Sequence, residues 1–191
     1  MRIGVLYYEG FAEFEIALSL LMFMKEEVVF LALEDKEYRN EEQQRLLPDS
    51  TLDEERASDF DLLLIPGGDV TPLVGNARLK AFIGEALRLG KKVAGICGGS
   101  ELLAAYGFLD GRECTGGTSG ITEKNPFHEH YKKARLSPDS VVVDGNVITA
   151  VGQGYAELAV ELGRQMGLVR TDEEYRAEMD WVKNRRGQPA I

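Results

Sequence analysis

Cys97 is the residue whose type and position most directly suggest covalent chemistry. It lies in the segment V-A-G-I-C-G-G-S, residues 93–100, where small and apolar residues lead into a cysteine followed by two glycines. The pattern predicts a strand over Val93–Ile96, a sharp turn, and a helix over Ser100–Tyr106. A thiol at a helix N-terminus is expected to have a lowered pKa and to be a better nucleophile. A buried cysteine that only packs beneath the helix is the alternative.

Two glycines near such a thiol can supply backbone donors. The run D-F-D-L-L-L-I is followed by Pro66, Gly67 and Gly68, so a strand is expected to end there in a tight turn. Glycine lets the backbone approach a neighbouring site closely. The amides of Gly68 and Gly98 are therefore candidates for an oxyanion hole. A simple turn without such a role is the alternative reading of the first segment.

Glu15 is the third candidate, in the segment E-G-F-A-E-F-E. We expect it just inside the first helix, where its carboxyl group would face the same crevice. Burial beside a thiolate would raise its pKa, and the protonated carboxyl would then donate a hydrogen bond to the Cys97 sulfur. Alternatively, Glu15 is an ordinary carboxylate that interacts with the helix dipole.

The rest of the chain supplies elements that would bring these residues together. Strands are predicted over Ile3–Tyr8, Val28–Leu33, Phe60–Ile65 and Val93–Ile96, with a hairpin over Val141–Ile148. Helices are predicted after Gly10, from the cap Asn76 to about Leu89, over Ser100–Tyr106, over Tyr155–Met166 and over Asp172–Asn184. The last of these carries Trp181 and is expected to dock on the domain. Residues 34–59 and 116–135 are expected to be mainly irregular. Alternating strands and helices predict a mainly parallel sheet covered on both faces, with ligands bound beyond the carboxyl ends of the strands.

Composition limits the class of protein. The chain has 191 residues, of which 44% are hydrophobic and 28% charged, as expected for one globular domain spanning residues 1–191. The net charge of −10 and the lack of a basic stripe argue against nucleic-acid binding. We predict no membrane span, no signal peptide, no cofactor and no metal site. With only two cysteines, Cys97 and Cys114, a disulfide framework is excluded and a cytoplasmic location is expected.

The combined motifs resemble the DJ-1/PfpI (ThiJ) superfamily, within the class I glutamine amidotransferase-like fold. The resemblance covers about Arg2–Gly167 and rests on the 10–15 segment, D-L-L-L-I-P-G-G, V-A-G-I-C-G-G, Y-G-F-L-D-G-R and V-V-V-D-G-N-V-I-T-A. It implies a flavodoxin-like three-layer sandwich and a homodimer. It also implies that Cys97 is the elbow cysteine, that Glu15 contacts it, and that Gly68 and Gly98 supply oxyanion-type amides.

The chain departs from this family where a base for the cysteine would be expected. Many relatives place a histidine near the position of Gly117, and protease-like members have one where Gly98 stands. The histidine of true glutamine amidotransferases is also missing from the segment 152–157. Peptidase and glutamine amidotransferase activity are therefore disfavoured, because Cys97 lacks an obvious general base.

The two histidines, His128 and His130, lie in the segment N-P-F-H-E-H-Y. One of them reaching the Cys97 site, in its own chain or in a partner's, is one hypothesis. A metal pair and a polar surface loop are the others, and a metal site would need more ligands than this segment supplies. Cys114, on a predicted short strand over Arg112–Thr115, is expected to be a small buried core residue.

Three functional hypotheses follow. The first is a cysteine-dependent hydrolase or lyase acting on a small carbonyl or amide compound through Cys97 and Glu15. The second is a non-catalytic stress or redox sensor in which Cys97 is oxidised to a sulfinate held by Glu15. The third is a module that binds a small-molecule ligand.

Overall fold

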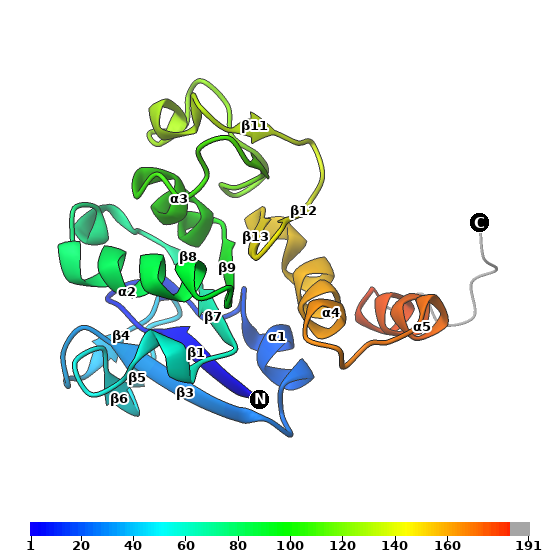
Figure 1. The fold of residues 1–191 in the computed structure, drawn as a ribbon, viewed down its shortest axis with the longest axis horizontal. Coiled ribbons are helices and arrows are strands. Elements are labelled where there is room, and N and C mark those ends of the chain that lie inside the picture. Colours follow the sequence, from blue (N-terminus) through cyan, green and yellow to red (C-terminus); the bar gives the residue numbers. More distant parts are fainter. Residues whose placement is uncertain (184–191) are drawn as a thin grey trace.

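The computed structural model describes residues 1–183, which form a seven-stranded sheet with helices on both faces (Figure 1). Its strands are β1 (Arg2–Leu6), β3 (Glu27–Ala32), β6 (Ser50–Thr51), β7 (Leu62–Ile65), β9 (Lys92–Ile96), β12 (Val141–Asp144) and β13 (Val147–Ala150). They lie in the order β12-β13-β9-β7-β1-β3-β6. All neighbouring strands are parallel except β12 and β13, which form the predicted antiparallel hairpin.

Five α-helices accompany the sheet: α1 (Ala17–Met22), α2 (Ala77–Arg88), α3 (Gly98–Ala105), α4 (Tyr155–Gln165) and α5 (Asp172–Val182). Helix α1 packs on α4, while α2 and α3 pack on β9. Figure 1 shows α2 on the side of the sheet opposite to α1 and α4. The predicted α/β, flavodoxin-like three-layer sandwich with a mainly parallel sheet is confirmed.

The central strands form the core because their side chains are covered on both faces. All four residues of β7 are buried, as are the last four residues of β1 and of β9. Continuous apolar runs of this kind are typical of parallel strands between two helical layers. The carboxyl ends of β1, β7 and β9 therefore meet at one edge of the sheet.

Short strands and 3-10 helices lie in the loops between the main strands and helices. The strands outside the main sheet form three pairs of two-residue strands: β2 (Phe11–Ala12) with β8 (Gly67–Gly68), β4 (Tyr38–Arg39) with β5 (Arg45–Leu46), and β10 (Glu113–Cys114) with β11 (Arg135–Leu136). The 3-10 helices are η1 (Ala57–Asp59), η2 (Thr71–Leu73), η3 (His128–Tyr131) and η4 (Gly152–Gly154). The β4–β5 pair lies in the stretch 34–59, which we had predicted to be irregular apart from a short helical turn.

Local signals placed several boundaries correctly. The Asn76 side chain accepts a hydrogen bond from the Leu79 amide and caps α2. Gly145 adopts a φ of 64° in the turn between β12 and β13, as the Asp-Gly sequence predicted. Cys114 is fully buried in β10, which confirms its expected place in the core.

Helix α5 packs on α4 outside the three layers (Figure 1). Thr171 and Glu174 form a reciprocal capping box at its start. Trp181, expected to dock this helix, keeps 44% of its surface exposed, and Lys183 forms an ion pair with Glu157 of α4 at 2.7 Å. Asn184, the predicted end of the helix, lies outside the described residues.

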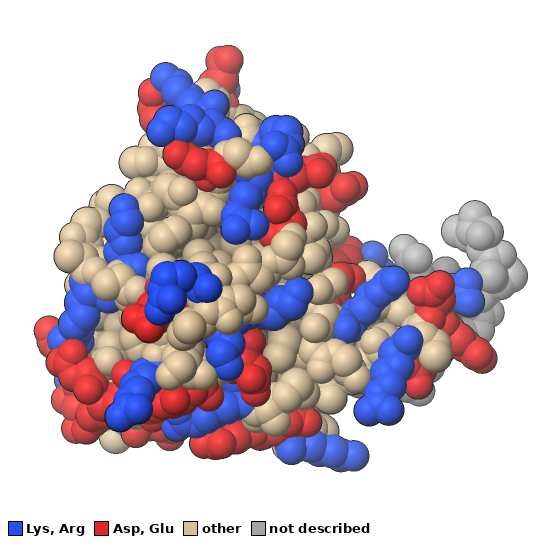
Figure 2. All heavy atoms as spheres, in the orientation of Figure 1, with Lys and Arg blue, Asp and Glu red and all other residues tan. Residues whose placement is uncertain are grey.

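The surface carries the charge expected from composition. Figure 2 shows acidic side chains gathered at the lower left of the view, in the region of β3 to β6, with Lys and Arg interspersed among them. Among residues 1–183, no helix combines the length and the apolar character that a membrane span requires.

Candidate active site

The backbone at Cys97 turns sharply between β9 and α3. Cys97 has φ 52° and ψ −118°, a conformation that a non-glycine residue adopts at a cost of about 1–3 kcal/mol. Its amide donates to the Ala150 carbonyl of β13 at 2.9 Å, and its carbonyl accepts from the Glu101 amide of α3 at 3.2 Å. Hydrogen bonds on both sides of the residue therefore hold this strained elbow in place.

The turn after β7 packs directly against the elbow. A Cβ atom on Gly98 would overlap the carbonyl oxygen of Gly68, so only glycine permits this approach. The Tyr8 hydroxyl fixes the turn from below by donating to the carbonyls of Pro66 at 3.0 Å and Gly67 at 2.5 Å. The predicted meeting of these strand ends is thus observed, although it is the carbonyl of Gly68 that faces Gly98.

Glu15 occupies a buried space beside Cys97. Its side chain is only 4% exposed, and its Oε2 atom is buried without a hydrogen-bond partner. Two glycines make the room: a Cβ on Gly67 would overlap Oε2, and one on Gly152 would lie 2.6 Å from Oε1 and 3.3 Å from Cys97 Sγ. The carboxyl group and the thiol therefore converge on the same small space.

The prediction that Glu15 lies inside the first helix is wrong. Helix α1 begins at Ala17, and Glu15 belongs to the turn between β2 and α1. The preceding residues Phe11 and Ala12 are not helical because they form β2, which pairs with β8. The amides of Glu13 and Phe14 donate to the Glu42 carboxylate. Interaction with the dipole of this short helix is thus not the reason for a glutamate at this position.

Burial controls the protonation of Glu15. It raises the pKa of this carboxyl to about 7, and the negative charges of Glu41 and Glu42 act in the same direction. The neighbouring Cys97 thiol and Gly67 amide partly offset the effect by hydrogen bonding to the carboxylate. The expected rise in the pKa of Glu15 is confirmed.

The expected lowering of the Cys97 pKa is not observed. Burial raises the pKa of this thiol to about 12, and the negative charge of Glu15 raises it further. The Thr118 hydroxyl and the Gly98 amide act in the opposite direction but do not outweigh burial. Above about pH 7 the pair therefore consists of a Cys97 thiol beside a Glu15 carboxylate, so the expected hydrogen bond from a protonated Glu15 to a Cys97 thiolate is not supported.

Thr118 is a neighbour of the sulfur that the sequence analysis missed. Its Oγ1 lies 3.9 Å from Cys97 Sγ, within reach of a weak hydrogen bond. Glu15 lies in the interior, whereas Thr118 is exposed, so the two groups approach the sulfur from its buried and its open side. The one available signal was the Gly-Gly pair at 116–117, which permits the backbone of this loop to approach another segment closely.

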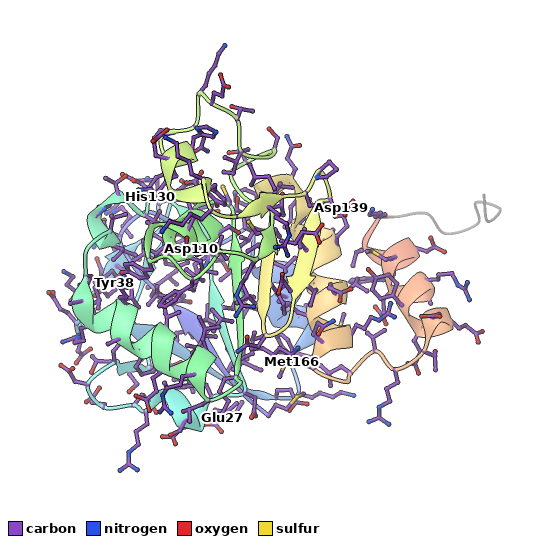
Figure 3. All side chains as sticks on the ribbon, turned by 45° about the horizontal axis from the view of Figure 1, so that its top comes forward. Glu27, Tyr38, Asp110, His130, Asp139 and Met166 are labelled. Carbon is purple, nitrogen blue, oxygen red and sulfur yellow. The ribbon has the colours of Figure 1, made fainter. Side chains whose placement is uncertain are left out.

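The histidines lie elsewhere. Both belong to η3, where Nδ1 of His128 is 3.9 Å from Glu129 and the His130 ring lies 5.8 Å from that of Phe127. Figure 3 shows His130 on this turn, in the loop region that follows β10. Within residues 1–183, no contact joins either imidazole to Cys97, and no cluster of three or more potential metal-ligating side chains occurs.

Comparison with known proteins identifies the family. The sequence model of the DJ-1/PfpI family matches residues 1–165. The chain belongs to the DJ-1/PfpI family. The fold agrees: a DJ-1 superfamily protein from Agrobacterium tumefaciens superposes with a TM-score of 0.80 at 25% identity, covering 97% of this chain and 100% of the other.

Curated relatives in the family carry different names. A Bacillus subtilis protein named as an uncharacterized protease is 31% identical over 126 residues, 65% of this chain and 59% of its own length. A deglycase from Thermococcus kodakarensis is 29% identical over 153 residues, 78% of this chain and 89% of its own. A glutathione-independent glyoxalase from Caenorhabditis elegans is 32% identical over 123 residues, 62% of this chain and 61% of its own. The chain thus spans about three fifths of the Bacillus relative.

Proposed function

We propose that this DJ-1/PfpI protein is an enzyme that adds the Cys97 thiol to the carbonyl group of a small aldehyde, with Glu15 as the proton acceptor. The observation that carries the proposal is the convergence of the Cys97 sulfur and the buried Glu15 carboxyl on Gly152. A carboxyl group with a pKa of about 7 is suited to general acid–base catalysis near neutral pH. Glu15 thus takes the role of general base for Cys97 that a histidine would otherwise have.

The choice of an aldehyde over an amide follows from the number of protons to be moved. Adding a thiol to an aldehyde transfers one proton from sulfur to oxygen and expels no leaving group. Cleaving an amide also requires protonation of a leaving amine, the usual task of a histidine. Because Glu15 is the titratable group that most affects Cys97, and no histidine contacts this thiol among the described residues, carbonyl addition is favoured over hydrolysis of peptides or glutamine.

The names glyoxalase and deglycase among the relatives support a 2-oxoaldehyde as the substrate class. In the first step the Cys97 sulfur bonds to the aldehyde carbon while its proton passes to Glu15, and Glu15 then gives that proton to the former carbonyl oxygen, which yields a hemithioacetal. A proton then moves from this carbon to the adjacent carbonyl carbon, and the hydroxyl proton moves to the oxygen of that adjacent carbonyl, which forms the thioester of a 2-hydroxy acid. Water hydrolyses the thioester, so the 2-oxoaldehyde and one water yield one 2-hydroxy acid and the free thiol.

The amides of Gly68 and Gly98 remain our candidates for stabilising negative charge on the substrate oxygen. The Gly98 amide belongs to the residue after Cys97 and lowers the pKa of the Cys97 thiol, so it acts on the reacting sulfur. A thiol with a raised pKa is mostly protonated at neutral pH and is oxidised slowly, which weighs against the redox-sensor hypothesis. Dimer formation and a cytoplasmic location stay predictions.

The test is incubation of the purified protein with methylglyoxal and measurement of the lactate formed. We expect turnover by the wild type and by Cys114→Ser, and a loss of about 10⁴-fold or more in Cys97→Ala. Equal lactate formation by Cys97→Ala and the wild type would contradict the proposal. Cys97-dependent cleavage of a peptide or of glutamine, without turnover of the aldehyde, would replace it with the amide hypothesis.

A further inference from the structure

The loop that follows β10 passes the open side of the Cys97 sulfur and is fixed there by its backbone. The Gly152 amide donates to the Gly117 carbonyl at 2.9 Å, and the Gln153 amide donates to the Thr118 carbonyl at 3.1 Å. Gly152 is also the residue against which Glu15 and Cys97 converge. The same short segment therefore sets the position of the carboxyl group and of the Thr118 side chain.

The conformation of this loop prevents residue 117 from presenting a side chain to the site without strain. Gly117 is buried with φ 66°, a left-handed conformation. A Cβ atom there would lie 3.1 Å from the Gly120 carbonyl oxygen and 3.2 Å from the side-chain nitrogen Nδ2 of Asn125. The position where the resemblance expects a histidine is thus closed, and the next side chain, Thr118, faces the sulfur.

A second hydrogen bond holds the far end of the loop. Asn125 Nδ2 donates to the Glu101 carboxylate at 2.7 Å, and Glu101 lies in the first turn of α3, directly after Cys97. The side-chain oxygen of Asn125, Oδ1, also accepts a hydrogen bond from the Phe127 amide at 2.7 Å. The loop is therefore tied both to the elbow and to the segment beside Glu15, so the backbone that carries Thr118 is held in place.

We propose that Thr118 is a catalytic residue whose hydroxyl donates a hydrogen bond to the substrate oxygen on the carbon that Cys97 attacks. The inference rests on the proposed carbonyl addition. An O–H···O hydrogen bond spans about 2.7 Å. The substrate oxygen is two bonds away from the Cys97 sulfur once the carbon is attacked. The Thr118 hydroxyl lies 3.9 Å from that sulfur, so the substrate oxygen can come within hydrogen-bond distance of it.

The division of roles follows from the two sides of the sulfur. Glu15 approaches from the interior and accepts the thiol proton, whereas Thr118 stands on the open side from which a substrate enters. A hydroxyl both accepts and donates, so Thr118 can hold the neutral carbonyl and the hydroxyl of the hemithioacetal alike. Its site therefore takes a small carbonyl compound with an oxygen on the attacked carbon.

The experiment measures two properties of Thr118→Val, which keeps the shape and removes the hydroxyl, and of Thr118→Ser, which keeps the hydroxyl. One is the equilibrium constant of the adduct between Cys97 and methylglyoxal, read as protection of Cys97 from alkylation. The other is kcat and KM for lactate formation. Ser119→Ala is the matched control, because it removes a hydroxyl from the adjacent exposed position of the same loop.

We expect Thr118→Val to weaken the adduct and to lower kcat about 10- to 100-fold, with Thr118→Ser and Ser119→Ala close to the wild type. An adduct as stable in Thr118→Val as in the wild type, or no adduct on the wild type at all, would overturn the inference. If Thr118→Val keeps both the stability of the adduct and the rate of lactate formation, the role of Thr118 is refuted and the proposed function of the protein is not. An adduct that depends on Thr118 but never yields lactate would support the role of Thr118 and refute the proposed turnover.

Discussion

Cys97 and Cys114 have similar thiol pKa values but very different neighbouring groups. Burial raises the pKa of both thiols, to about 12 for Cys97 and about 11 for Cys114. Cys97 nevertheless stands at a strained elbow between a buried carboxyl group and a hydroxyl, and is partly exposed. Cys114 lies fully buried in β10, and the charged group that affects its pKa most is Asp144. The comparison teaches that a proton acceptor and access, rather than a low resting pKa, distinguish the candidate nucleophile here.

The largest contrast should appear in alkylation of the native protein. We expect an added thiol reagent to modify Cys97 at least about 100-fold faster than Cys114, because Cys114 reacts only after local opening of the core. Peptide mass analysis after timed labelling gives both rates, and a denatured sample supplies the control in which the two thiols react alike. Comparable rates in the native protein would remove the basis of the comparison.

Substitution of Glu15 should change how stability depends on pH. The folded protein holds a proton on Glu15 up to about pH 7, whereas the unfolded chain releases it near the ordinary value of 4.5. The free energy of unfolding of the wild type should therefore fall between about pH 4.5 and pH 7, by about 3 kcal/mol more than that of Glu15→Gln. Denaturant unfolding of both proteins from pH 4 to pH 8 measures the difference.

A matched glutamate variant makes this result specific. Glu13→Gln removes a carboxylate from the same turn, and its effect on the slope should be small because Glu13 is not buried. Parallel stability curves for the wild type and Glu15→Gln would show that the Glu15 carboxyl group titrates normally in the folded state.

Replacing the cysteines should have the smallest effect on stability, and the two replacements should differ in their effect on activity. Cys114→Ala leaves a cavity in the core and should cost about 1–2 kcal/mol of unfolding free energy while turnover continues. Cys97→Ala, at a partly exposed position, should cost less and abolish turnover. Unfolding at pH 6 together with lactate formation measures both, and a larger stability loss in Cys97→Ala would assign that residue to packing.

The sequence was most informative where a signal is local or where topology is regular. The Gly-rich junction after Ile96, the Asn76 cap and the Asp144–Gly145 turn each specify a structure within a few residues. The rule that strand ends of a parallel sheet meet at one edge then brought Cys97 and Gly68 together.

Long-range contacts account for what the sequence did not show. Glu15 lies in a turn because β2 pairs with β8, more than fifty residues along the chain, and no local pattern reports that pairing. The rise in the Cys97 pKa depends on burial by the whole fold, which outweighs the local helix N-terminus. Thr118 reaches the sulfur through backbone hydrogen bonds to Gly152 and Gln153, which only the folded loop reveals.

The pH dependence of kcat/KM for a 2-oxoaldehyde tests the central claim, that Glu15 accepts the Cys97 proton, most directly. In the wild type, kcat/KM should rise with an apparent pKa of about 7 as the Glu15 carboxyl group ionises. In Glu15→Gln it should be lower by about 10²- to 10⁴-fold, and the rise near pH 7 should disappear. The same rise in Glu15→Gln, with activity near that of the wild type, would show that another group takes the proton and would contradict the account.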